Sequence, residues 1–348
     1  MPPSRNRRMV QDGTSHASEL KAQSTRAYQV PKRGVLSRLP VSWVPYAELS
    51  RIEKPGGLYG VYMAYLLGLG YGGSVFSPTL SPGTLAYSAA ILLVYCVFHR
   101  GAACTANDIM DREFDREVAR CRNRPVARGA LTPGQAWLWY FVQVLGTAST
   151  IACLPSPMLA LIYAIPIQIL GSIYPLSKRL TDFPQLILGL PIAGGILMAA
   201  ASVGLKPLDT SSLAIVGATA SLTASHYIWT VIFDYVNACQ DTSDDIRAGV
   251  RSMAVRYHDT DAFITTLGTA QVACLLLTGI LAGFSLAYFV LAVGGNAICL
   301  MAMVKTVSRS RSDICGWWFA WGGLLVSGTT AMGLLAEYYC RFCDENCA

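Results

Sequence analysis

The chain has 348 residues, a formal net charge of +6 and a mean hydropathy of +0.41. Hydrophobic residues make up 53% of it and charged residues only 14%, whereas a soluble domain carries about 25% charged residues. This composition excludes an ordinary soluble globular protein and makes the lipid bilayer the expected partner. We expect no nucleic-acid partner.

The first 45 residues differ from the rest, because they are polar and basic and lack the apolar core of a secretory signal. Such a segment is typical of a disordered cytosolic tail. A mitochondrial transit peptide, which is rich in Arg and Ser and poor in acids, is the alternative. Asp12 and Glu19 interrupt the segment and its apolar residues do not recur at helical spacing, which favours the tail.

Nine runs of roughly 20 apolar residues follow, the length that crosses about 30 Å of hydrocarbon. They lie near 55–72, 83–106, 133–153, 156–176, 183–204, 211–233, 261–283, 285–304 and 316–339. Gly and Pro inside these runs do not argue against helices, since membrane helices tolerate both. The sequence therefore predicts an all-α, polytopic membrane protein with about nine transmembrane helices between residues 46 and 340.

The charges between these runs predict the orientation of the helices. Segments after the second, fourth, sixth and eighth runs are rich in Lys and Arg, whereas those after the first, third and seventh contain no charged residue. Cytosolic loops of membrane proteins carry the excess of Lys and Arg. We therefore expect the N-terminus in the cytosol and the C-terminus on the opposite side.

Two aspartate-rich segments lie at the ends of apolar runs. In the first, Asp108, Asp111 and Asp115 are spaced i, i+3 and i+7, which places them on one face of a continuing helix with Asn107 at its edge. Like charges on one face repel unless cations lie between them. Carboxylate and amide oxygens are the ligands that Mg²⁺ prefers.

The second segment repeats this arrangement, with Asp241 and Asp245 at i, i+4 and Asp244 beside them. It also follows an even-numbered run, so the topology brings both segments to the cytosolic side. Mg²⁺ is usually held by a few carboxylates and substrate phosphates. Two facing clusters therefore predict a diphosphate bound between Mg²⁺ ions.

Other interpretations use the same acids. Solvated loop acids that balance nearby arginines need no ligand, and an ion-coupled transporter uses acids inside the membrane. A transporter would place them near the midplane, whereas both clusters here fall at the ends of runs. A membrane terpene cyclase also uses acids, but one cluster would suffice for it.

Four motifs resemble the signatures of the UbiA superfamily of intramembrane prenyltransferases. Residues 107–115, followed by 122–125, resemble its Asn-Asp-x-x-Asp-x-x-x-Asp signature, and residues 240–252 its Asp-x-x-x-Asp signature. Residues 51–56 resemble its entry into the first helix and residues 174–181 the end of its fourth helix. The resemblance implies nine transmembrane helices around a central cavity and Mg²⁺-dependent transfer of an isoprenoid from its diphosphate to an acceptor that is usually aromatic.

The resemblance also implies roles for individual residues. Six residues would hold the Mg²⁺ ions: Asn107, Asp108, Asp111, Asp115, Asp241 and Asp245. The five aspartates and Lys178 are the expected catalytic residues. Further contacts to the diphosphate or the acceptor would come from Arg51, Asn107, Arg122, Tyr174 and Lys178. Asp244 and Glu113 stay outside the set of Mg²⁺ ligands. The proton that the alkylated acceptor ring loses could go to an aspartate or to the departing diphosphate, and the sequence does not choose between them.

The residues within these motifs resemble those of the fungal branch of this family. That branch contains farnesyltransferases of meroterpenoid pathways, which act on polyketide-derived phenolic acids, and 4-hydroxybenzoate polyprenyltransferases of ubiquinone synthesis. Residues 119–130 and the weak targeting character of the first 45 residues favour the meroterpenoid enzymes. An endoplasmic reticulum membrane is then expected, with the mitochondrial inner membrane as the alternative.

Several other residues are expected to be structural. A short tail, residues 341–348, contains Cys343 and Cys347, and Cys340 directly precedes it. These three thiols lack the fourth ligand that zinc sites need. His226 falls within an apolar run, where packing is its expected role. The oligomeric state does not follow from the sequence.

Overall fold

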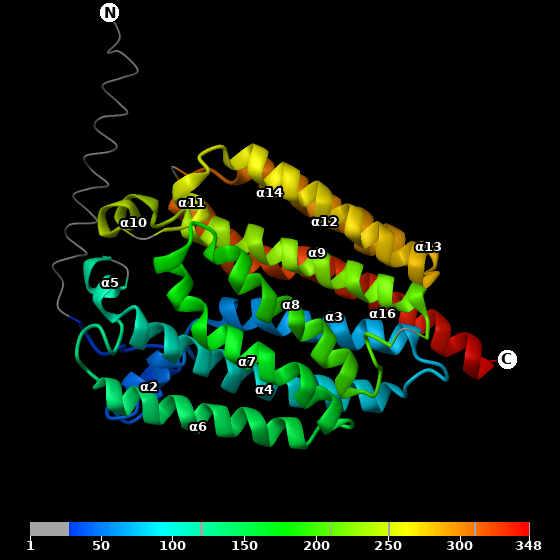
Figure 1. Ribbon diagram of the computed structural model, residues 1–348, viewed down its shortest axis with the longest axis horizontal. Helices are drawn as coiled ribbons and strands as arrows, with labels where there is room; N and C mark the ends of the chain where they lie inside the picture. Colours follow the sequence, from blue (N-terminus) through cyan, green and yellow to red (C-terminus); the bar gives the residue numbers. More distant parts are fainter. Residues whose placement is uncertain (1–27, 119–120, 210, 250, 310, 348) are drawn as a thin grey trace, which may run out of the picture.

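The regular structure of the chain is helical throughout the residues that can be described. The structure is a computed structural model that describes residues 28–118, 121–209, 211–249, 251–309 and 311–347. Its long helices run side by side along the longest axis of the molecule. The short helices α5 (Arg112–Glu117) and α10 (Thr242–Ala248) lie together at one end (Figure 1). The predicted all-α fold class is confirmed.

In the described part of the chain, nine long helical segments correspond to the nine apolar runs. Seven are single α-helices: α3 (Pro55–Val75), α4 (Pro82–Met110), α6 (Pro133–Ala152), α7 (Pro157–Leu180), α8 (Pro184–Ser202), α9 (Leu213–Ala238) and α12 (Thr260–Ala282). The eighth consists of α13 (Leu286–Tyr288), the π-helical turn η2 (Phe289–Gly294) and α14 (Gly295–Thr306). The ninth consists of α15 (Ser312–Trp317), the π-helical turn η3 (Trp318–Gly322) and α16 (Gly323–Cys347).

Among the described residues, seven of these segments are both long and apolar enough to cross a membrane. α3 and α6, with 21 and 20 residues, have the length but lie outside that set, because Gly, Tyr, Gln and Trp make them less apolar. The chain is an integral, multi-pass membrane protein. Nine membrane crossings stay a prediction.

The positions where helices begin follow from local chemistry. Pro occupies the first turn of α3, α4, α6, α7 and α8, where its missing N–H removes no helical hydrogen bond. Ser81 accepts a hydrogen bond from the Thr84 N–H at the start of α4. At the start of α6, Thr132 and Gln135 form a reciprocal capping box.

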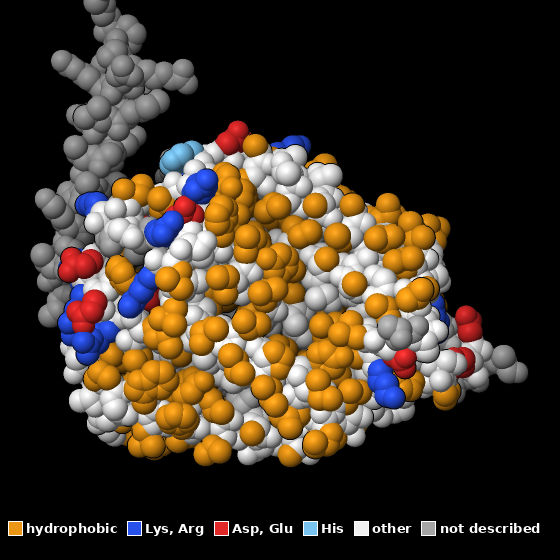
Figure 2. Space-filling model, in the orientation of Figure 1, with side chains coloured by type: hydrophobic (Ala, Val, Ile, Leu, Met, Phe, Trp, Pro, Cys, Tyr) orange, Lys and Arg blue, Asp and Glu red, His pale blue; other side chains and the backbone are white. Residues whose placement is uncertain are grey.

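The surface divides into apolar and charged regions. Figure 2 shows hydrophobic side chains across the middle of this face, with charged side chains gathered toward its ends. Exposed side chains along the helices include Leu138, Leu145, Ile162 and Ile169. This distribution suits a belt in contact with lipid between two polar surfaces.

Helix α8 lies inside the bundle, in contact with α3, α7 and α9. Small residues permit this close packing. A Cβ atom placed on Gly68 of α3 would lie 2.8 Å from the Ala199 Cβ and 2.9 Å from the Ile196 Cα, both on α8. Close approach at small residues is typical of helix pairs in membranes.

The two ends of the chain are more helical than the sequence indicates. Residues 28–45 include the short 3₁₀ helix η1 (Leu36–Arg38) and the start of α2 (Val44–Leu49), and the Tyr28 hydroxyl donates to Glu48 Oε1 at 2.6 Å. The disordered tail predicted for residues 1–27 lies outside the described residues. At the other end, α16 continues through residues 341–347.

Replacement of Gly68 by Ala is expected to destabilise the protein by about 1–3 kcal/mol, because the added methyl group meets α8 backbone that cannot move freely. Thermal unfolding in detergent measures the effect. Gly328→Ala in α16 is the matched control, since no atom lies within 4 Å of its Cβ position. Equal melting temperatures for the two variants would contradict the close α3–α8 contact.

Candidate functional site

A cavity of about 330 Å³ lies among α3, α4, α7, α8 and α9 and reaches the end of the bundle where α5 (Arg112–Glu117) and α10 (Thr242–Ala248) meet. Both aspartate-rich segments line it, through Asn107, Asp111 and Asp115 on one side and Asp241 and Asp245 on the other. The structure therefore brings the two segments together on one cavity. Helix topology brings together carboxylates that are more than 120 residues apart in the sequence.

The two walls share one spacing that the sequence analysis missed. Asn107, Asp111 and Asp115 follow one another at intervals of four residues. Asn237, Asp241 and Asp245 do the same on the opposite wall, and all six line the cavity. Residues four apart lie on one helical face, so each wall presents an amide followed by two carboxylates.

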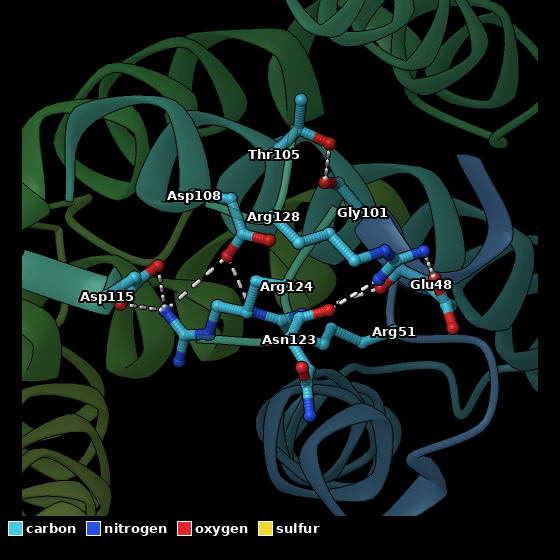
Figure 3. A network of polar contacts seen from close by, with 9 residues as sticks. All are labelled: Glu48, Arg51, Gly101, Thr105, Asp108, Asp115, Asn123, Arg124 and Arg128. Carbon is cyan, nitrogen blue, oxygen red and sulfur yellow. Dashed lines mark hydrogen bonds and ion pairs between the residues drawn. The ribbon is translucent and has the colours of Figure 1, made fainter. Parts of the chain in front are cut away.

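Asp108 is placed differently from the prediction. Its side chain is fully buried and does not line the cavity, so the cavity face of the first segment is Asn107–Asp111–Asp115. Arg51 donates to Asp108 Oδ1 at 2.6 Å, and Arg124 NH1 lies 3.5 Å from the same oxygen. Arg124 also donates to both oxygens of Asp115 at 2.8 Å. Figure 3 shows Arg124 between the two carboxylates.

Arg51 adopts a left-handed backbone conformation, with φ of 56°, which is uncommon for a residue other than glycine. Such strain persists only where surrounding contacts fix the backbone. Arg100 of α4 donates to the carbonyl oxygens of Arg51 and Lys54, each at 3.0 Å. The preceding Ser50 is joined to Gln143 Oε1 at 3.0 Å. These contacts hold Arg51 against Asp108.

A second ion pair supports this corner of the site. Arg128 donates to Glu48 Oε2 at 2.6 Å and also to the backbone oxygen of Asn123 (Figure 3). The Tyr28 hydroxyl donates to the other oxygen of Glu48, and burial, together with this bond, raises the pKa of Tyr28 to about 12. Tyr28 therefore remains a donor at neutral pH, and the segment before α2 is fastened to the loop that carries Arg124.

The opposite wall is braced from the loop between α7 and α8. Arg251 lines the cavity, and its Nε donates to Asp182 Oδ1 at 2.7 Å, while Arg256 donates to Asp182 Oδ2 at 3.0 Å. The hydrogen bond from Arg251 and the charges of both arginines hold the pKa of Asp182 below its ordinary value. Gln185, another lining residue, accepts a hydrogen bond from the Met253 N–H.

The remaining predicted residues fall into separate groups. Arg51 and Tyr174 line the cavity, whereas Arg122 does not. Glu113, which the sequence analysis left outside the predicted ligand set, is exposed and pairs with Arg112 and Arg116. The side chains of Lys178, Asp244 and Cys347 lie outside the described residues, so their predicted roles stay predictions.

Several lining residues were missed: His99, Arg100, Arg124, Asp234, Asn237 and Arg251. The four-residue repeat of the second segment could have revealed Asn237. Arg124 was quoted within a motif, but its contact with two carboxylates depends on the loop that folds back between α5 and α6. Nothing in the sequence distinguishes His99 from the other residues of an apolar run.

The two walls fit Mg²⁺ by their chemistry, since they offer only carboxylate and amide oxygens. Within the part of the chain that the structure describes, no three Asp, Glu, His or Cys side chains converge closely enough to enclose an ion alone. Mg²⁺ in proteins usually keeps several waters and is held by one or two carboxylates together with substrate phosphates.

The cavity can be compared with known proteins. The model of the UbiA prenyltransferase family matches residues 61–328. The chain is 37% identical to prenyltransferase AscA of Acremonium egyptiacum over 293 residues, which cover 84% of this chain and 85% of that protein. It is 35% identical to DMOA farnesyltransferase NvfB of Aspergillus novofumigatus over 314 residues, which cover 88% of this chain and 95% of that protein.

Solved structures share the fold. A UbiA homologue from Aeropyrum pernix matches 80% of this chain and 97% of its own, with a TM-score of 0.61 and 20% identity. A UbiA homologue from Archaeoglobus fulgidus, solved with DMAPP and Mg²⁺ bound, matches 81% of this chain and 99% of its own, with a TM-score of 0.58 and 16% identity. At these identities the likeness concerns the fold alone.

Replacement of Asp108 by Asn is expected to destabilise the protein by about 3 kcal/mol, because it removes the buried carboxylate and leaves Arg51 and Arg124 without their shared partner. Thermal unfolding in detergent measures this loss. Asp313→Asn, which breaks the exposed pair with Arg311, is the control and should leave the melting temperature unchanged. A melting temperature of D108N equal to that of the wild type would contradict a structural role for Asp108.

Proposed function

Because the chain belongs to the UbiA prenyltransferase family, we propose that it transfers a farnesyl group from its diphosphate to an aromatic, polyketide-derived phenolic acid in meroterpenoid biosynthesis. It is a membrane-embedded prenyltransferase. The proposal is carried by one observation: the same cavity is lined by both sets of oxygen ligands, by four arginines and by apolar side chains.

The polar end of the cavity is suited to the diphosphate. Asn107, Asp111 and Asp115 would hold Mg²⁺ on one wall, and Asn237, Asp241 and Asp245 on the other. Mg²⁺ bound there would neutralise the charge of the diphosphate and of the six-residue ligand set. Asp108, buried behind the first wall, would act by holding Arg51 and Arg124 and not as a direct ligand.

The arginines would supply the charge that the leaving group needs. Arg51, Arg100, Arg124 and Arg251 all line the cavity. When the allylic C–O bond breaks, its electron pair goes to the diphosphate oxygen, and fixed cations near that oxygen lower the barrier. Because most of these guanidinium groups are already held by carboxylates or carbonyl oxygens, little reorganisation is needed as the charge develops.

The apolar part of the cavity would receive the allyl group and the ring. Val61, Leu188, Ile192, Phe233 and Phe319 line it, and Phe319 belongs to the π-helical turn η3. Aliphatic and aromatic walls exclude water, which would otherwise capture the allyl cation before the acceptor ring does. π-Helical turns often occur at functional sites, in agreement with this position of Phe319.

One relative supports the choice of donor and acceptor, since it is named DMOA farnesyltransferase. Other relatives at 31–37% identity are named as fungal prenyl- or polyprenyltransferases. The membrane that we propose is the endoplasmic reticulum, since the basic segment before residue 45 lacks the helical periodicity of a transit peptide.

The direct test incubates membranes that contain the protein with farnesyl diphosphate, Mg²⁺ and a panel of phenolic acids that includes orsellinic-type acids and 4-hydroxybenzoate. We expect a prenylated orsellinic-type product by mass spectrometry. Asp111→Ala and Asp241→Ala should each lower turnover at least about 10²-fold, because each removes a ligand of the metal and diphosphate site. Glu113→Gln, an exposed acid on the same segment, should retain activity. Product from 4-hydroxybenzoate alone would contradict the proposed acceptor.

Asn237→Leu tests the second wall separately. Loss of the amide is expected to weaken Mg²⁺-dependent binding of farnesyl thiolodiphosphate, an unreactive donor analogue, by roughly 10-fold or more. Isothermal calorimetry with and without Mg²⁺ measures the change. Equal affinities of N237L and the wild type in the presence of Mg²⁺ would exclude Asn237 from the site.

A further inference from the structure

His99 lies on the cavity wall but away from the acidic end. It precedes Asn107 by eight residues of α4, which is about 12 Å along a helix axis. Its side chain is only 5% exposed, and its ring stacks on Tyr95 with centroids 5.4 Å apart and planes 13° apart. The imidazole is therefore fixed in one orientation at the inner part of the cavity.

Hydrogen bonds to Ser172 determine how the Gln168 amide points. The Ser172 hydroxyl donates its single proton to the backbone carbonyl oxygen of Gln168 at 2.7 Å. It must therefore accept from its other neighbours, the Gln168 Nε2 at 3.1 Å and the Tyr140 hydroxyl at 2.8 Å. The amide nitrogen of Gln168 faces Ser172, so the amide oxygen faces His99.

This orientation fixes the tautomer of His99. His99 Nδ1 lies 2.9 Å from Gln168 Oε1, which can only accept a hydrogen bond, so Nδ1 carries the proton. In the neutral ring, Nε2 then has a lone pair. No described residue forms a hydrogen bond with Nε2.

The Nε2 side of the ring is turned toward Gly171, which also lines the cavity. A Cβ placed on Gly171 would lie 3.7 Å from His99 Cε1 and 4.0 Å from Nε2. Glycine at this position therefore leaves space in front of the nitrogen. Nε2 is therefore accessible from the cavity, and its lone pair can accept a hydrogen bond from a hydroxyl group of a bound ligand.

We propose that His99 binds the phenol hydroxyl of the acceptor through Nε2 and acts as the general base of the transfer. This inference rests on the proposed function and adds the residue that positions and activates the acceptor. The acceptor then lies at the inner part of the cavity, with the diphosphate at the acidic end, and the reacting carbon of the donor lies between them.

The proton and electron steps balance without another reagent. The allylic C–O bond breaks and its electron pair goes to the diphosphate, while the π electrons of the ring carbon beside the hydroxyl form the new C–C bond. His99 Nε2 takes the hydroxyl proton as the oxygen forms a carbonyl. The imidazolium returns that proton to the oxygen when the alkylated ring carbon loses its hydrogen to the diphosphate, which restores the aromatic ring.

His99→Phe tests the inference in the full-length protein, with the phenolic acid that the wild type accepts. We expect kcat to fall about 10²-fold or more, which is the usual contribution of a general base, while the affinity for farnesyl thiolodiphosphate stays within twofold. Ring-fluorinated acceptors, whose hydroxyl groups are more acidic, should show a smaller deficit, because they need a base less. A deficit that is constant across this series, or a shared loss of donor affinity, would indicate a merely structural role and overturn the inference.

Gly171→Ala gives a second test that keeps the His99–Gln168 pair. Its methyl group makes ordinary van der Waals contact with the imidazole, so the fold is unaffected, and it covers Nε2. The KM for the phenolic acid should rise several-fold with donor affinity unchanged, and an unchanged KM would count against the inference. If the wild type prenylates no phenolic acid, the proposed function itself is wrong. If the wild type is active and H99F and G171A are equally active, the proposed function stands and only the role of His99 is refuted.

Discussion

The site depends on one buried carboxylate. Asp108 has no exposed surface, yet it lies at the end of α4 where two arginines converge on one of its oxygens. Removing a charge from water costs several kcal/mol, so such a group is retained only with close partners. Through Arg51 it fixes the strained loop before α3, and through Arg124 it fixes the loop after α5. Both loops form the rim of the cavity.

From this anchor the chemistry separates into two parts of one cavity. The acidic walls and the arginines can hold a diphosphate and its metal ions because their charges are nearly balanced before substrate arrives. Farther along α4 from the acidic end, His99 lies on the cavity wall, and its tautomer is set by Gln168 and Ser172. Separate positions for the leaving group and the acceptor let one small cavity promote ionisation and still exclude water.

Particular residues show how much of the fold and of the site could be predicted from the sequence. The nine runs predicted the long helices to within a few residues at most of their ends, because a span of hydrocarbon and a Pro in the first turn are local features. The face of the first acidic segment was predicted less well. Helical spacing grouped Asp108 with Asp111 and Asp115, but the contacts of Arg51 and Arg124 turn Asp108 away from the cavity.

The sequence by itself determined the membrane class, the helices, the two acidic segments and their common end, since composition, length and periodicity are properties of short stretches of chain. Only the tertiary structure decided which oxygens face the cavity, that Arg124 bridges Asp108 and Asp115, and that His99 presents an unpaired nitrogen. These features depend on contacts between helices and loops far apart in the sequence. Such contacts are set by how α4, α7 and the loop after α5 pack together, which no local pattern records.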